Sequence, residues 1–255
     1  MKSKEMQFFL LISFVVGLTI STQAQDAEAL RQRVLEASHS TRINDAEMKP
    51  WHLKISFQLY DPKGKPSDQG TIEEWWAGPM LWKLRIESPS YTASSIENRE
   101  GDFRTIGSSR LPPPIATVLR ELLYPMPMTE DLGGEMAHLR HEKVQNASLE
   151  CIELRDATTV IPSLTFTYTY CFDPMSNVLR EIHSTDSRRS TLRDKVENFQ
   201  GRSVALAITT RIGKSNTATA EVTDLSEIAI TEGLFTPSRE MERVMDAHTE
   251  TIIRR

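Results

Sequence analysis

The sequence of 255 residues has no excess of basic charge, no glycine-rich phosphate loop and almost no cysteine, and each absence excludes a class of protein. Lys and Arg total 30 against 35 Asp and Glu, whereas nucleic acid binding requires a concentrated basic surface. The phosphate-binding loop and the G-x-S-x-G motif of hydrolases are both missing. Because the chain has a single long apolar run, a polytopic membrane protein is also excluded. The composition that remains, 39% hydrophobic and 25% charged, is typical of a globular protein.

The single apolar run lies at the start of the chain and has the features of a secretory signal. Two lysines precede an apolar stretch of 13 residues, 8–20, and small residues follow it. We expect residues 1–24 to be a signal peptide that is cleaved after Ala24, which would make the protein periplasmic. The alternative is an uncleaved segment that anchors the chain in the inner membrane. Because Gln25 rather than a cysteine follows Ala24, lipidation at this site is not expected.

Three segments have the apolar spacing of amphipathic helices. Residues 26–38 predict a helix of about three turns. Residues 111–125 predict a second helix, because three consecutive prolines suit a helix start and an apolar stripe follows them. The tail, 238–255, has apolar residues at helical spacing, and we expect it to form a C-terminal helix after the main domain.

Most of the remaining chain alternates apolar and polar residues, which predicts strands with one buried face. The first such run is HLKISFQLY, and the segment after it, 61–70, is expected to be a turn because it contains two Pro and two Gly. Further strands are expected near 71–77, 81–88, 91–98 and 102–107. Strand signals resume from about 136 and continue to 230, with runs at 148–155, 164–172, 177–184, 190–199, 203–213 and 217–230. We therefore predict a mainly β domain over 25–237, in which about 11–12 antiparallel strands form a curved sheet or unclosed β-barrel.

The two cysteines, Cys151 and Cys171, are expected to form one disulfide in an oxidising compartment, with free thiols as the alternative. If they face each other across an antiparallel hairpin, every pair of opposed residues has numbers that sum to 322. This register places Ile152 opposite Tyr170 on an apolar face and leaves the cysteines on a polar face. We therefore expect the disulfide to be a structural staple that lies away from any ligand.

Residues with the chemistry for catalysis or metal binding are not arranged to act together. His138 and His141 are three positions apart on an expected strand, so their side chains would point to opposite faces and would not share a zinc ion. Glu73 and Glu74 also lie on opposite faces of one strand, which is the wrong arrangement for shared acid–base catalysis. We expect no enzyme activity, no metal and no cofactor.

The candidate ligand-binding residues are the apolar side chains that the alternation places on the concave side of the sheet. A curved sheet with few helices to fill it can leave an apolar cavity there, although each of these residues could instead belong to an ordinary core. The candidates are Leu53, Ile55, Phe57, Leu59, Trp76, Trp82, Leu84, Ile86, Phe166, Tyr168, Tyr170 and Phe172.

This pattern resembles the LolA-like family of periplasmic lipoprotein carriers. The matching features are the helix at 26–38, the strand HLKISFQLYD, the hairpin WWAGPMLWKLRIESP, the helix PPPIATVLRELLYP, the turn region CFDPMSNVLREI and the closing segment DLSEIAITEGLFTPSRE. The resemblance covers roughly residues 26–237. It implies an unclosed barrel lidded by helices, with an apolar cavity that holds the acyl chains of a client.

Two functions are therefore expected as alternatives. The first is an exported, monomeric carrier that binds the acyl chain of a lipid or lipoprotein in the half-barrel, with an envelope protein as a further partner. The second is a non-catalytic envelope sensor or protein-interaction module whose half-barrel is filled by its own side chains. Neither function involves nucleic acid.

Overall fold

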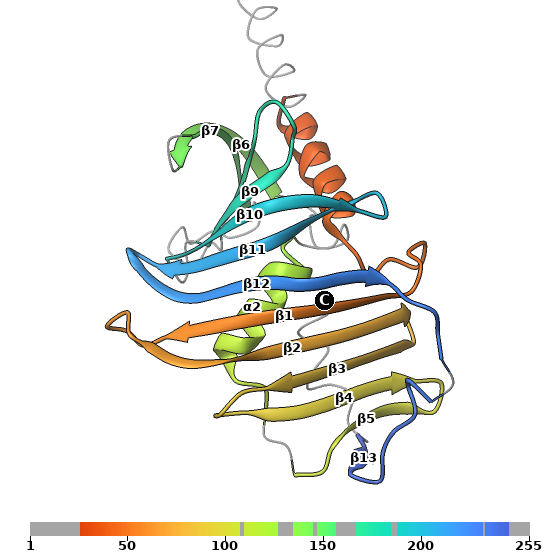
Figure 1. Ribbon diagram of the computed structural model, residues 1–255. Helices are drawn as coiled ribbons and strands as arrows, with labels where there is room; N and C mark the ends of the chain where they lie inside the picture. Colours follow the sequence, from red (N-terminus) through yellow and green to blue (C-terminus); the bar gives the residue numbers. More distant parts are fainter. Residues whose placement is uncertain are drawn as a thin grey trace, which may run out of the picture.

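In the part of the chain that it describes, the computed structural model shows one antiparallel sheet with two helices packed on it (Figure 1). The residues that it describes are 26–107, 110–126, 135–144, 147–156, 167–184, 188–231 and 233–244. The expected signal segment, 1–24, and the tip of the cysteine hairpin lie outside these residues.

Thirteen strands make up the sheet in this part of the chain. Those before the second helix are β1 (Trp51–Tyr60), β2 (Pro66–Gly78), β3 (Leu81–Glu87), β4 (Thr92–Asn98) and β5 (Gly101–Thr105). Those after it are β6 (Glu135–Val144), β7 (Ala147–Asp156), β8 (Thr167–Phe172), β9 (Leu179–Ser184), β10 (Arg189–Phe199), β11 (Arg202–Ile212), β12 (Ser215–Glu227) and β13 (Met241–Arg243).

The strand order is β13-β5-β4-β3-β2-β1-β12-β11-β10-β9-β8-β7-β6. Two meanders, β1–β5 and β6–β12, are therefore joined at the centre by the antiparallel pairing of β1 with β12. Since β13 and β6 lie at opposite ends of this order, the described sheet is not closed into a barrel. The prediction of a mainly β, unclosed antiparallel sheet is confirmed, with 13 strands instead of about 11–12.

The alternation of β1 determines which face of the sheet is buried. Leu53, Ile55 and Phe57 are buried, and the residues between them are only partly buried, as period-2 patterning requires. We call the face that bears these three side chains the inner face. The other side of the sheet is the outer face.

The two helices cover different parts of the inner face. The N-terminal helix, residues 26–41, packs Val34 and Ala37 into a buried cluster with side chains of β6–β9. The second helix, α2 (Pro113–Leu123), packs its apolar stripe into a larger cluster formed by β1–β4, β11 and β12. In Figure 1, α2 crosses behind the central strands, and the N-terminal helix stands beside the curled end of the sheet. The inner face therefore contains two apolar clusters, each with its own helix.

The expected turn at 61–70 is wrong in its second half. The turn consists of residues 61–65 only. It is closed by a hydrogen bond from the Asp61 N–H to the Lys65 carbonyl at 2.8 Å, and Gly64 has the positive φ, +77°, that such a tight turn requires. Strand β2 begins at Pro66, and its first residues pair with the end of β1. The long alternation of β1 continues to Tyr60, and a partner strand of matching length stabilises it.

The expected C-terminal helix, 238–255, is wrong where the structure describes it. Residues 241–243 form β13, which pairs with β5. Backbone bonds from the Ile106 N–H to the Glu240 carbonyl, at 2.9 Å, and from the Val244 N–H to the Asp102 carbonyl, at 2.8 Å, extend this pairing. Residues 241–243 form hydrogen bonds with backbone groups of β5 that would otherwise lie at the edge of the sheet. The spacing of apolar residues within the tail cannot predict this pairing with a distant strand. The end of the chain, 245–255, lies outside the described residues.

The register predicted for the cysteine hairpin is confirmed residue by residue. Cys151 faces Cys171 across β7 and β8, and Ile152 faces Tyr170. The Cα atoms of the two cysteines are 3.9 Å apart, and the sulfurs are bonded. The disulfide lies on the outer face, fully buried beside Leu149, whereas Ile152 and Tyr170 point to the inner face.

Replacing both cysteines, Cys151→Ser with Cys171→Ser, should lower the free energy of unfolding by about 2–4 kcal/mol, because the bond closes a loop of 20 residues in the unfolded chain. Equilibrium denaturation in guanidinium chloride measures the loss. Wild-type protein in a strong dithiol reductant is the matched control and should be destabilised by a similar amount. Equal stability of the double mutant and the oxidised wild type would contradict a stapling role.

Candidate ligand-binding site

A half-open pocket of about 50 Å³ lies on the inner face, between α2 and strands β2–β4. It has room for a few water-sized groups and does not enclose a long acyl chain as it stands. Its lining residues are Glu74, Trp82, Leu84, Ile86, Tyr91, Ala93, Ser95, Leu111, Leu119 and Tyr124.

The strand register explains how these side chains come together. On the inner face, Glu74 of β2 is opposite Leu84 of β3. Two residues further along β2, Trp76 is opposite Trp82. Trp82 also donates its indole N–H to a carboxylate oxygen of Glu97 on β4. Cross-strand pairing thus sets the floor of the pocket, and α2 supplies Leu119 above it.

Three of the predicted candidates, Trp82, Leu84 and Ile86, line this pocket together. Five others, namely Leu53, Ile55, Phe57, Leu59 and Trp76, are buried in the apolar cluster beneath α2 and do not line it. In the structure they are core residues packed together with α2.

The remaining candidates lie elsewhere in the molecule. Tyr170 and Phe172 belong to the cluster under the N-terminal helix. Tyr168 is 40% exposed at the start of β8, and its ring stacks on that of Tyr170 at a centroid distance of 6.3 Å. Phe166 lies outside the described residues. The sequence pattern therefore grouped side chains that the structure divides between two clusters.

A buried arginine connects the sheet to α2. Arg193 of β10 is only 1% exposed, and its Nη1 donates a hydrogen bond to the carbonyl of Glu121 in the last turn of the helix. The Nε of Arg189, on the same strand, lies 3.4 Å from the Glu121 carboxylate. Burial lowers the pKa of Arg193 to about 10, so the guanidinium stays charged at neutral pH. A cation at this position is favourable because the C-terminal end of a helix is partially negative.

The pairing of strands shows why Arg193 points inward. Arg193 faces Ile208 of β11, and Ile208 faces Ala220 of β12, both of which are buried in the cluster under α2. Analysis of the sequence did not identify Arg193 or Glu121. The only signal is a charged residue at an inward position of a strand, and it becomes visible only when the register is known.

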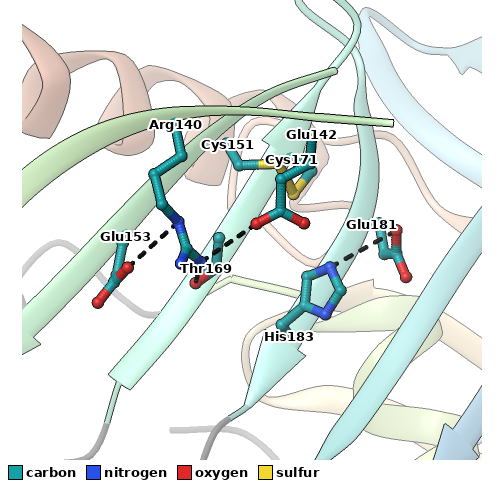
Figure 2. The surroundings of a disulfide bond; sticks show 8 residues. All are labelled: Arg140, Glu142, Cys151, Glu153, Thr169, Cys171, Glu181 and His183. Atoms are coloured by element: carbon teal, nitrogen blue, oxygen red, sulfur yellow. Dashed lines mark hydrogen bonds and ion pairs between the residues drawn. A yellow bond between two sulfur atoms is a disulfide. The ribbon is translucent and has the colours of Figure 1, made fainter. Parts of the chain in front are cut away.

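A second group of polar residues surrounds the disulfide on the outer face (Figure 2). Arg140 of β6 lies 3.2 Å from the Glu142 carboxylate and 3.3 Å from that of Glu153. On β9, His183 lies 3.5 Å from Glu181, and hydrogen bonding to Glu181 raises the pKa of His183. Pairing with Arg140 offsets part of the cost of burying the Glu153 carboxylate, whereas Glu142 is only partly buried.

The same group contains the atoms that come closest to a metal-ligand set. A Glu142 carboxylate oxygen and the two cysteine sulfurs lie within 4.8 Å of one another. Both sulfurs are in the disulfide, so neither is a thiolate that could bind a metal ion. His138 and His141 occupy opposite faces of β6, because His138 pairs with Glu153 on the outer face and His141 pairs with Glu150, which contacts the N-terminal helix through Arg33.

The architecture of an unclosed antiparallel sheet with helices on its inner face is the LolA-like fold. A LolA superfamily protein from Nitrosomonas europaea has a similar structure, with a TM-score of 0.50 and 13% identity over 81% of this chain and 97% of that one. A putative outer membrane lipoprotein-sorting protein domain from Vibrio parahaemolyticus gives a TM-score of 0.50 at 10% identity, over 82% and 97% of the two chains. A DUF1329 family protein from Desulfovibrio piger gives 0.53 at 9% identity, over 82% and 96%.

The similarity extends to the fold and not to the sequence. No protein-family model matches this chain, and no curated protein matches it. Within the described residues, none of the helices has both the length and the apolar composition to cross a membrane.

Arg193→Met should loosen α2, because the substitution removes a charge-assisted hydrogen bond to the helix end and keeps most of the apolar volume. A bond of this kind contributes roughly 1.5–3 kcal/mol, so amide hydrogen exchange in residues 113–123 should be faster by about tenfold or more. Lys195→Met is the matched control, because Lys195 is on the same strand but makes an exposed ion pair with Glu221 at 2.6 Å. Unchanged exchange in α2 of the Arg193 variant would show that Arg193 does not hold the helix.

Proposed function

We propose that this protein is an exported, non-catalytic carrier that holds the apolar chain of a lipid or lipoprotein under α2. The observation that carries the proposal is the arrangement of α2 itself. It is an amphipathic helix that covers the apolar inner face and is held at its last turn by Arg193, with a small pocket already open beside it. The lipoprotein-sorting description of the Vibrio parahaemolyticus neighbour supports this role.

In this proposal the observed structure is a closed conformation, in which α2 covers the inner face, and a ligand binds by displacing α2. The pocket of about 50 Å³ is the entry point, and the apolar residues of α2 occupy the space that a longer chain needs. Moving α2 exposes apolar surface at a cost of about 25 cal/mol per Å², and an apolar ligand offsets this cost by covering the same surface. The ligand therefore binds the open conformation better than the closed one, which is the condition for shifting the population.

The location of the carrier outside the cytoplasm is supported by two features. The apolar segment within 1–24 has the pattern of a secretory signal, and the disulfide is typical of an oxidising compartment. In this proposal the mature protein is a periplasmic monomer that exchanges its ligand with another envelope protein. An uncleaved signal would instead keep the same carrier at the inner membrane.

A filled interaction module is the second candidate, and one observation favours it. The pocket is small, and the side chains of Leu53, Ile55 and Phe57 are already packed beneath α2. A module of this kind would keep its inner face closed and would bind partners only through its surface.

A pocket-filling substitution separates the two candidates. Ala93 of β4 lines the pocket, and Ala93→Phe places a ring in a space of about 50 Å³. We expect the variant to bind a fluorescent fatty acid methyl ester at least about tenfold more weakly than the wild type, a loss of about 1.4 kcal/mol of binding free energy. Fluorescence titration measures the affinity, and the ester is chosen because it carries no charge.

The matched control is Ser94→Phe, which adds a ring to the outer face of β4 at the position next to Ala93, where Ser94 faces Arg85 of β3. This control should bind the ester as the wild type does. A wild-type protein that does not bind the ester at all would contradict the carrier and favour the filled module. Equal binding by the wild type and Ala93→Phe would show that the ester binds outside this pocket.

A further inference from the structure

The two edges of the sheet differ in how they are covered. At one end of the strand order, residues 241–243 of the same chain pair with β5 as β13. At the other end lies β6, and no strand in the described part of the chain pairs with its free side (Figure 1). Ten residues at roughly 3.3 Å each give this edge a length of about 33 Å. Its backbone N–H and C=O groups are therefore available to a further strand.

The side chains of β6 are exposed on both faces of the sheet. His138 and Arg140 are exposed on the outer face. Leu139, His141 and Lys143 alternate with them and are exposed on the inner face. In β1, at the centre of the sheet, every side chain is buried or partly buried. The middle of β6 is therefore accessible to a partner from either face and from its free side.

An apolar strip of the inner face reaches this edge. Leu139 faces Ile152, which is buried under the N-terminal helix, but Leu139 is itself 44% exposed. Tyr168 of β8 is 40% exposed and faces Leu154 on the same side of the sheet. A strand added to β6 would place alternate side chains beside Leu139 and would extend this apolar strip.

The charges of β6 indicate the chemistry of the partner. Four of its five exposed side chains are basic in type, namely His138, Arg140, His141 and Lys143. Arg140 already pairs with Glu142 and Glu153, so an incoming strand meets mainly Lys143 and the two histidines. Acidic side chains on the added strand would complement these groups, whereas a second copy of β6 would bring the same basic side chains. The edge therefore fits an acidic partner strand better than a second copy of the chain.

We propose that the free edge of β6 is a docking site for an extended acidic segment of another protein, which binds by adding a strand to the sheet. In this mode of recognition, main-chain hydrogen bonds provide affinity and alternate side chains provide selectivity. The proposal goes beyond the carrier function and does not rest on it, because a docking edge of this kind serves a carrier and an interaction module equally well.

The experiment uses three seven-residue peptides with blocked ends as probes. The first alternates valine with glutamate, the second alternates valine with lysine, and the third is the acidic peptide with methylated backbone nitrogens. By isothermal titration calorimetry at pH 6.0 and low salt, we expect the acidic peptide to bind at least about fivefold more tightly than the basic one. The methylated peptide should not bind, because it has no N–H groups to donate. Nonspecific attraction would favour the basic peptide instead, since the chain has a net charge of −5.

Amide hydrogen exchange locates the bound peptide. The acidic peptide should slow exchange in residues 135–144 and leave 101–105 unchanged, because β5 is already paired with β13. Leu139→Glu should weaken its binding at least about fivefold, because the new carboxylate interrupts the apolar strip and repels the acidic strand. Ile212→Glu is the matched control, because Ile212 is a 51% exposed apolar residue on β11, and this variant should bind as the wild type does. Lys143→Glu keeps the apolar strip and should reduce the preference for the acidic peptide.

Several results would overturn the proposal. They are no binding of the acidic peptide at about 1 mM, equal affinity for the acidic and basic peptides, binding of the methylated peptide, and protection of strands other than β6. Sedimentation of the wild type as a dimer that Leu139→Glu converts to a monomer would assign the edge to a second copy and would also overturn it. The methyl ester titration tests the carrier separately, so the two proposals can fail independently.

Discussion

The structure depends on one constraint, which is that an unclosed sheet with an apolar inner face must cover that face without a second sheet. The described chain meets this constraint with two helices, and each covers one apolar cluster. Because hydrophobic packing alone does not fix where a helix ends, a polar contact is valuable at the edge of the larger cluster. Arg193 supplies it from the inner face of β10 by donating to the end of α2. A charged residue that is fully buried at this place links the position of the helix to the sheet.

This arrangement connects stability to function. The cover over the larger cluster is an 11-residue helix held by apolar contacts and a few polar ones, so it is easier to displace than a strand of the sheet. The disulfide lies on the outer face of β7 and β8, away from α2, where it crosslinks the two strands of a hairpin. Glu74, like Arg193, departs from the apolar pattern of the inner face, and it lines the pocket beside α2.

The features that the sequence predicts well are those determined by local periodicity. The alternation of β1, the apolar stripe of α2 and the hairpin register from Cys151 to Cys171 all follow from spacing along the chain. The failures depend on distant contacts. The tail at 241–243 became a strand because the edge of β5 was available, and the inward position of Arg193 is defined only once β10 pairs with β11. The apolar candidates were identified as inward, but the spacing could not show that two helices divide them between two clusters.

The central claim is that α2 covers a space that an apolar ligand fills in the working protein. Native mass spectrometry of the protein isolated gently from envelope extract, followed by lipid analysis of the released material, tests this claim most directly. The account predicts a fraction of the protein with a discrete added mass, and a released molecule that has an alkyl chain. A protein that is always recovered at the mass of its own chain, and that stays so after incubation with envelope lipids, would contradict it.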